Sequence, residues 1–108
     1  MEKEFQKDVN ALKGGIGCDL VTVTGTFNAR KGAIYGVQSN AASSRLTGIV
    51  EIRSNLGTSA DKVTLTGGSG RTYLNGKDIN DGKWVIFDYP ISSIVVGAGS
   101  FWVYYQEI

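Results

Sequence analysis

The chain has 108 residues, of which 15 are Gly, one is Cys and none is His, and its 11 basic residues nearly balance its 10 acidic ones. This length predicts one small domain, and the absence of His excludes Ser–His and Cys–His catalytic pairs and the commonest metal ligand. A lone Cys excludes an internal disulfide, and a formal net charge of +1 gives no electrostatic case for binding nucleic acid or a membrane. We therefore expect a protein that is not an enzyme and needs no cofactor.

The first residues differ from the rest of the chain. Residues 1–13 hold six of the 21 charged residues and no Gly, and three apolar residues among them recur at the i, i+4, i+7 spacing of a short amphipathic helix. Because a helix of this length is marginal alone in water, it must pack on its own body or on a partner. We predict an N-terminal arm over residues 1–15, helical or extended. One interpretation is a terminus that is frayed or docked on its own body. The other is a partner-binding segment, and its candidate contacts are Phe5, Val9 and Leu12.

Short β-rich segments follow from residue 19 onward, with Gly-containing turn signals between them. In chain order they are 20–24, 33–37, 46–53, 63–66, 72–74, 83–87, 92–96 and 100–105. Pro90 is expected to lie between two strands, where its missing N–H does no harm. The pattern predicts an all-β fold, a small antiparallel β-sandwich or barrel of seven to eight short strands. We expect this single domain to span residues 16–108.

The candidate chemical sites are weak. The loop 67–71 has Gly amides and an Arg to hold an anion, but it lacks the Lys-Ser/Thr pair of a P-loop, so a hairpin loop is the favoured interpretation. Segment 75–81 has the composition of a calcium-loop fragment without the ligand spacing, and two tight turns explain it. Glu51 and Asp88 are candidates for a glycosidase-like acid pair, but both are predicted at outward strand positions. Cys18 has no partner for catalysis. We predict no catalytic, cofactor or metal site.

The aromatic residues are concentrated near the C-terminus, where seven of the eleven lie in the last quarter of the chain. The last predicted strand is apolar on both faces, with positions 101, 103 and 105 on one and 102 and 104 on the other. Such a strand is either central in a sandwich or covered by another chain, and Tyr and Trp also suit sugar stacking. Three interpretations stay open, namely core, subunit interface and ligand platform. The candidate residues are Trp84, Phe101, Trp102, Tyr104 and Tyr105.

The stretch 84–105, WVIFDYPISSIVVGAGSFWVYY, resembles the closing hairpin of small virion proteins of tailed bacteriophages. In that family, a strand ending in an aromatic and a small residue or Pro leads to a strand of the form S/T-x-I. A Gly-containing turn and a terminal strand ending in Tyr follow. Segment 32–38, GAIYGVQ, and its continuation Leu46-Thr47-Gly48 are similar to the family's early segment. The region 55–81 and the N-terminal arm depart from the pattern.

This resemblance implies a non-enzymatic capsid or tail component that is present in many copies. We expect a capsid decoration or auxiliary protein that is made in the host cytoplasm and located in the virion. Its expected partners are the major capsid protein or other virion proteins, bound through the arm and an aromatic β-surface, with no nucleic acid or membrane partner. A homo-oligomer, with a trimer favoured, is also expected. The alternative is a carbohydrate- or host-surface-binding β-module of a tail or fibre.

Overall fold

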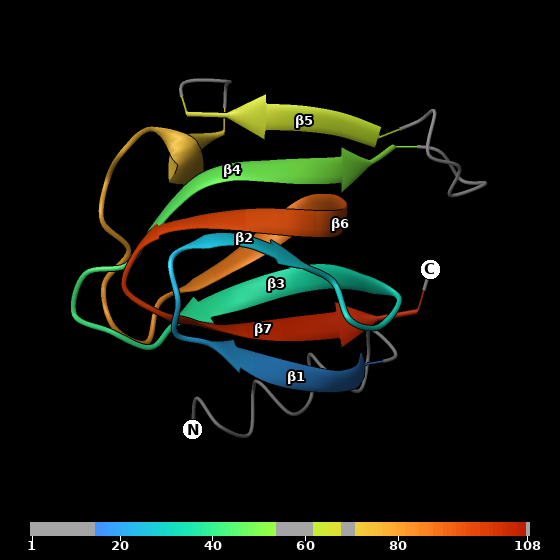
Figure 1. The fold of residues 1–108 in the computed structure, drawn as a ribbon, viewed down its shortest axis with the longest axis horizontal. Helices are drawn as coiled ribbons and strands as arrows, with labels where there is room; N and C mark the ends of the chain where they lie inside the picture. Colours follow the sequence, from blue (N-terminus) through green and yellow to red (C-terminus); the bar gives the residue numbers. More distant parts are fainter. Residues whose placement is uncertain (1–14, 54–61, 68–70, 108) are drawn as a thin grey trace.

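A computed structural model describes residues 15–53, 62–67 and 71–107, and within them seven strands form one antiparallel sheet (Figure 1). The all-β prediction is therefore confirmed. Across the described ranges, no helix has the length and hydropathy needed to span a membrane. The elements are β1 Gly15–Val21, β2 Gly25–Asn28, β3 Ala33–Ser39, β4 Arg45–Ile52, β5 Lys62–Thr66, the 3₁₀ helix η2 Thr72–Leu74, β6 Trp84–Ala98 and β7 Phe101–Gln106.

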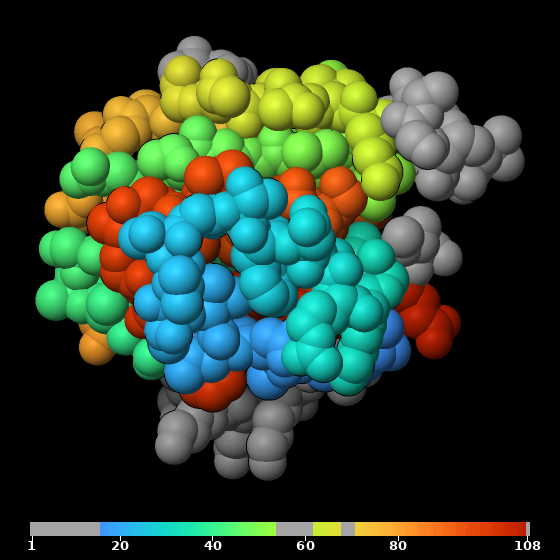
Figure 2. All heavy atoms as spheres, viewed as in Figure 1, coloured from blue at the N-terminus to red at the C-terminus, as the bar shows by residue number. Residues whose placement is uncertain are grey.

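Strand β6 links the two halves of the sheet. The strand order is β1-β7-β3-β6-β4-β5, and β2 pairs with β6 outside this path. The first half of β6 pairs with β3, whereas its second half pairs with β4 and β2. The sheet can thus fold over along β6 and enclose side chains from both halves. Figure 2 shows the atoms of β2 and its flanking turns covering the front of the molecule.

Pro90 lies inside β6, so the prediction of two separate strands on either side of it was wrong. Ile34 of β3 lies opposite Ile91 and Gly36 lies opposite Ile86, so the β6 residues between have no partner in β3. Pairing with β4 begins only at Ile91. The missing N–H of Pro90 therefore costs no ladder hydrogen bond, and the extended chain continues through it.

Strand β7 gives one of its two faces to the core. On β7, the side chains of Phe101, Val103 and Tyr105 are fully buried, while those of Trp102 and Tyr104 between them are half-buried on the opposite face. The core cluster is completed by side chains from β1, β3, β4, η2 and β6 and by Ile79. The strand alternation read from the sequence therefore gives the correct grouping of side chains in β7.

One other predicted strand was wrong, and a second has different bounds. Residues 72–74 form the 3₁₀ helix η2, closed by a hydrogen bond from the amide of Leu74 to the carbonyl of Arg71, and the Leu74 side chain is buried in the core. The strand predicted at 20–24 begins earlier and ends at Val21. Val23 lies in the following turn with 72% of its surface exposed, and β2, which had no prediction, starts at Gly25.

Candidate functional site

The outer face of four neighbouring strands carries a set of uncharged residues that are mostly aromatic or apolar. Register places Trp102 of β7 opposite Leu20 of β1 and opposite Gln38 of β3, and Gln38 opposite Trp84 of β6. A second row lies beside the first in the same strands. We call these eight residues the aromatic face, and they are Leu20, Trp102, Gln38 and Trp84 in the first row and Cys18, Tyr104, Gly36 and Ile86 in the second.

Three aromatic rings pack together across this face. The ring centroids of Trp84 and Tyr104 are 4.6 Å apart, and those of Tyr35 and Tyr104 are 6.3 Å apart. Both separations lie within the range of favourable aromatic contacts. Tyr35 lies at a register shift of β3 and is only 3% exposed. Burial, with smaller contributions from Tyr104 and Cys18, raises the pKa of Tyr35 to about 12, so its hydroxyl stays neutral at physiological pH.

The edges of the aromatic face are accessible. Leu20 is 41% exposed and Ile86 is 43% exposed, and both lie beside the half-buried aromatic side chains of the same face. Gly36 provides the space for Ile86, because a Cβ atom at Gly36 would lie 2.9 Å from Ile86 Cδ1. The face therefore presents apolar area to solvent on both sides of its aromatic centre.

The structure divides the predicted aromatic candidates into two groups. Phe101 and Tyr105 are core residues, whereas Trp84, Trp102 and Tyr104 belong to the aromatic face. The predicted contacts of the arm, Phe5, Val9 and Leu12, lie outside the described residues.

A second site is built around Glu51, whose side chain is 0% exposed. The prediction that Glu51 points outward was therefore wrong. Its Oε1 accepts hydrogen bonds from Arg53 Nη2 at 2.7 Å and Arg71 Nη2 at 3.1 Å, and its Oε2 accepts one from Arg71 Nε at 3.0 Å. Burial alone would raise the pKa of Glu51, but the hydrogen bonds and charges of the two guanidinium groups outweigh it and hold the pKa below its usual range.

Arg71 also brings the second predicted acid into this cluster. Its Nη1 lies 3.1 Å from Asp88 Oδ2, so one guanidinium bridges Glu51 and Asp88. Because Arg71 lies between them, each carboxylate is paired with a cation. The Asp88 side chain is exposed, whereas that of Glu51 is sealed.

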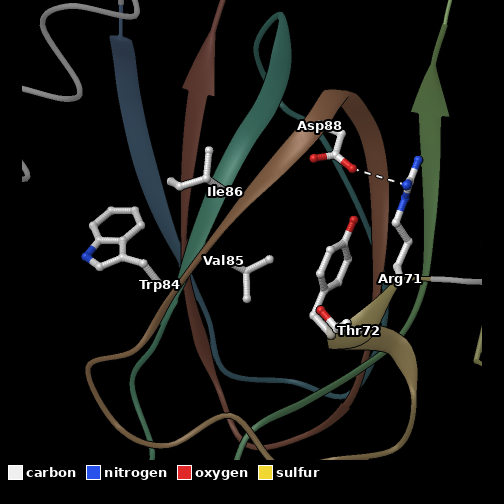
Figure 3. Close-up of a pocket in the computed structure, with 7 residues that line it drawn as sticks. Arg71, Thr72, Trp84, Val85, Ile86 and Asp88 are labelled. Atoms are coloured by element: carbon white, nitrogen blue, oxygen red, sulfur yellow. Dashed lines mark ion pairs between the residues drawn. The ribbon is translucent and has the colours of Figure 1, made fainter.

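A groove of about 390 Å³ runs beside this cluster, between η2 and the first half of β6. One wall consists of Arg71, Thr72 and Tyr73, and the other consists of β6 residues between Trp84 and Asp88. Figure 3 shows the Trp84 and Ile86 side chains on the opposite side of β6 from Arg71 and Thr72. We call this the β6–η2 groove.

The Tyr73 hydroxyl is unusual in this groove. Its oxygen is buried, yet within the described part of the chain it has no hydrogen-bond partner. The ring packs edge-on against Phe87, with centroids 5.5 Å apart. Burial, followed by the charge of Glu51, raises the pKa of Tyr73 to about 12.

The remaining sequence candidates have other surroundings. Residues 68–70 of the predicted anion loop lie outside the described residues. Asp78, in the calcium-like segment, pairs with Arg45 at 2.7 Å. Over the ranges that the structure describes, no three His, Cys, Asp or Glu side chains gather as a metal site would require. The thiol of Cys18 is free and exposed on the aromatic face.

Sequence reasoning considered Arg71 only as a possible anion ligand of the loop 67–71 and did not predict its pairing with Glu51. It missed Tyr73, which lies in a segment predicted as a strand. The one available signal was the acid Glu51 between the apolar residues Val50 and Ile52 of a predicted strand. Comparison with protein-family models, curated proteins and solved structures finds no match to this chain.

Proposed function

We propose that this chain is a non-enzymatic structural protein of a phage virion, a capsid decoration or auxiliary protein that attaches to the assembled particle. The observation that carries the proposal is the aromatic face, which presents Leu20 and Ile86 beside half-buried Trp and Tyr side chains. Aromatic residues are enriched at the centres of protein interfaces, where they combine large contact area with low entropic cost.

The composition of the aromatic face favours adhesion by contact rather than by charge. None of its eight residues is acidic or basic, and each belongs to a strand of the sheet. A specific interface needs about 800 Å² from each partner, so neighbouring surface must contribute as well. In this proposal the N-terminal arm supplies that extra contact through Phe5, Val9 and Leu12, an expectation that rests on the sequence alone.

The resemblance to small virion proteins of tailed phages supports the same function. Its longest segment, residues 84–105, covers nearly all of β6 and β7, which are adjacent in sequence and both central in the sheet. In this proposal, the protein assembles as a trimer on the major capsid protein or another virion protein. It needs no cofactor and works by binding alone.

The experiment is cosedimentation of the purified full chain with empty capsids of the phage that encodes it. We expect the wild type to sediment with the capsids and Leu20→Asp to stay in the supernatant, because a buried unpaired charge opposes docking. Val23→Asp is the matched control, since Val23 is exposed and aliphatic but lies outside the aromatic face. Equal retention of both variants would exclude the aromatic face as the attachment surface.

The contribution of the arm is tested with a double variant, Phe5→Ala with Leu12→Ala. We expect it to keep the circular dichroism spectrum and unfolding midpoint of the wild type and to lose capsid binding. Retention equal to that of the wild type would remove the arm from the proposal and leave the aromatic face as the sole attachment surface.

A carbohydrate- or host-surface-binding module is the second candidate function. It is favoured by the placement of Trp84 and Trp102 in one row of the same sheet face, since sugars stack on such surfaces. Both indoles would report binding. Saturable quenching of tryptophan fluorescence by one glycan of a panel, lost in Trp102→Ala, would favour this function, and its absence together with capsid binding would exclude it.

A further inference from the structure

The first half of β6 has one unpaired edge inside the sheet. Strand β6 pairs with β3 between Trp84 and Ile91, but β4 reaches its other side only from Ile91 onward. The edge of Trp84–Ile86 that faces away from β3 therefore has no partner strand among the described residues. The β6–η2 groove lies along this edge.

The direction of the backbone groups follows from the hydrogen-bond pattern. Residues of an antiparallel strand turn their N–H and C=O groups alternately toward one neighbour and then the other. The carbonyl of Lys83 accepts a 2.9 Å hydrogen bond from the Ser39 amide of β3, and the carbonyl of Val85 also lies against β3. Trp84 and Ile86 therefore direct their N–H and C=O groups away from β3, into the groove.

These groups are unpaired within the described part of the chain. No strand pairs on that side of Trp84–Ile86, and no hydrogen bond from a turn, loop or side chain to these groups is present in the described ranges. Because the side chains of Trp84 and Ile86 lie on the opposite side of β6, these residues contribute their backbone to the groove wall (Figure 3). Two amides and two carbonyls, at positions two residues apart, form the repeat to which another β-strand hydrogen-bonds.

From this geometry we propose that the β6–η2 groove binds an extended peptide segment of a partner protein, which adds to the edge of β6 as a short strand. The segment has apolar side chains at alternate positions, which lie beside Trp84 and Ile86 on the outer face. Its intervening side chains are polar and face the Tyr73 hydroxyl. The Arg71–Asp88 ion pair closes one end of the groove and limits the paired stretch.

Tyr73 provides independent support for a polar occupant. Its buried hydroxyl lacks a partner in the described residues, and such a group costs free energy until something hydrogen-bonds to it. The η2 wall of the groove is held in place, because Arg71 donates two hydrogen bonds to the buried Glu51 carboxylate. A rigid wall and unpaired backbone groups together reduce the ordering cost of binding.

The two terminal edges of the sheet, those of β1 and β5, are less suitable for strand addition. The β1 edge carries a register shift between Gly15 and Cys18, and irregularities of this kind protect edges from pairing. The β5 edge begins at the exposed Lys62, and Lys on an edge strand has the same effect. The β6 edge has neither feature between Trp84 and Ile86.

Amide hydrogen exchange of the full chain tests the premise. We expect the amides of Trp84 and Ile86 to exchange more than about tenfold faster than that of Val85, which bonds to β3. Similar protection at all three positions would show that this edge is already paired and would overturn the proposal.

Binding is tested with a displayed library of random nonapeptides selected on the wild-type protein. We expect enriched peptides with alternating apolar residues, and we expect a synthetic copy to protect the Trp84 and Ile86 amides. Ile86→Pro removes the N–H that points away from β3 and also replaces the aliphatic side chain, so Ile86→Ala, which keeps the N–H, is its matched control. We expect the β3 ladder to tolerate the proline and peptide affinity to fall about fivefold further than in Ile86→Ala, because one hydrogen bond is lost. Thr72→Trp, which fills the groove from an exposed position on η2, is the second variant if Ile86→Pro fails to fold.

Leu20→Asp is the control that separates this proposal from the virion function. It alters the aromatic face and leaves the groove intact, so peptide affinity is expected to equal that of the wild type whether or not capsid binding survives. The proposal is overturned if no peptide is enriched or if the bound peptide protects β1 or β5 amides instead. Binding of a saccharide at Tyr73 and Asp88, with no binding of any peptide, would also overturn the proposal.

Discussion

The hydroxyl of Tyr105 donates a 2.6 Å hydrogen bond to Asp19 Oδ2, and this contact ties the central strand β7 to the edge strand β1. The other carboxylate oxygen of Asp19 accepts a 2.7 Å hydrogen bond from Arg30 Nη1. Asp19 thereby links the buried Tyr105 to Arg30, whose side chain is exposed. Burial and the bond to Asp19 together raise the pKa of Tyr105, so the hydroxyl keeps its proton in the native range of pH.

Tyr105→Phe tests the value of this bond. A hydrogen bond to a charged acceptor contributes roughly 1.5–3 kcal/mol, so we expect the free energy of unfolding in urea to fall by that amount. Tyr104→Phe is the matched control on the same strand, because no hydrogen bond of the Tyr104 hydroxyl is present in the described part of the chain. Equal losses in the two variants would show that the Asp19 bond is energetically neutral.

Glu51→Gln tests the buried ion pairs. Removing one partner of a buried charge pair costs about 3–5 kcal/mol, and we expect the lower end because Arg53 is partly exposed and can be rehydrated. Asp78→Asn breaks an ion pair in which both side chains are more than a third exposed, so it is the control, expected to cost less than about 1 kcal/mol.

The pH dependence of stability gives a second test of Glu51. Its pKa is lower in the folded chain than in the unfolded chain, so its stabilisation is complete above the unfolded pKa and is lost as the pH falls through the folded pKa. The stability gap between wild type and Glu51→Gln should therefore be constant near neutrality and shrink below about pH 4.3. A gap that stays constant down to pH 3 would contradict the assigned pKa shift.

The sequence predicted four strands closely, since β3, β4, β5 and β7 lie within two residues of their predicted bounds. Runs of β-branched and aromatic residues between Gly-containing turns locate these strands. The sequence did not predict the continuity of β6, since Pro90 normally marks a break. The strand can continue through Pro90 because no partner strand pairs with that residue. This depends on the pairing of the sheet and not on the local sequence.

The candidate sites were less predictable than the strands. The sequence placed Trp102 and Tyr104 on one face of β7, but their rows with Leu20 and Trp84 depend on cross-strand register, which arises only when four strands align. The burial of Glu51 depends on Arg71, which is distant in sequence and reaches it through a turn. Local patterns contain no information on either relationship.

Gly99→Ala tests a turn that the sequence did predict. Gly99 has a φ of +73°, and a Cβ atom there would lie 2.6 Å from the Ser43 carbonyl oxygen. Backbone strain and the clash with the main chain together predict a loss of roughly 2–4 kcal/mol in the free energy of unfolding. Gly82→Ala is the control, because its φ of +82° is similar but its Cβ would meet nothing within 4 Å, so only the strain of about 1 kcal/mol applies. Equal losses would show that the main-chain contact at Gly99 relaxes freely.

Tyr73→Phe should have the opposite effect to Tyr105→Phe, although both remove one buried hydroxyl. The Tyr73 oxygen is buried without a partner in the described residues, so deleting it removes a desolvation cost and keeps the ring contact with Phe87. We expect the free energy of unfolding to rise by about 1 kcal/mol. The same variant should bind a groove-selected peptide more weakly than the wild type does. The hydroxyl is destabilising while it is unpaired in the free protein, but it would hydrogen-bond to the bound peptide strand. Lower stability combined with unchanged peptide affinity would mean that Tyr73 already has its partner within the chain.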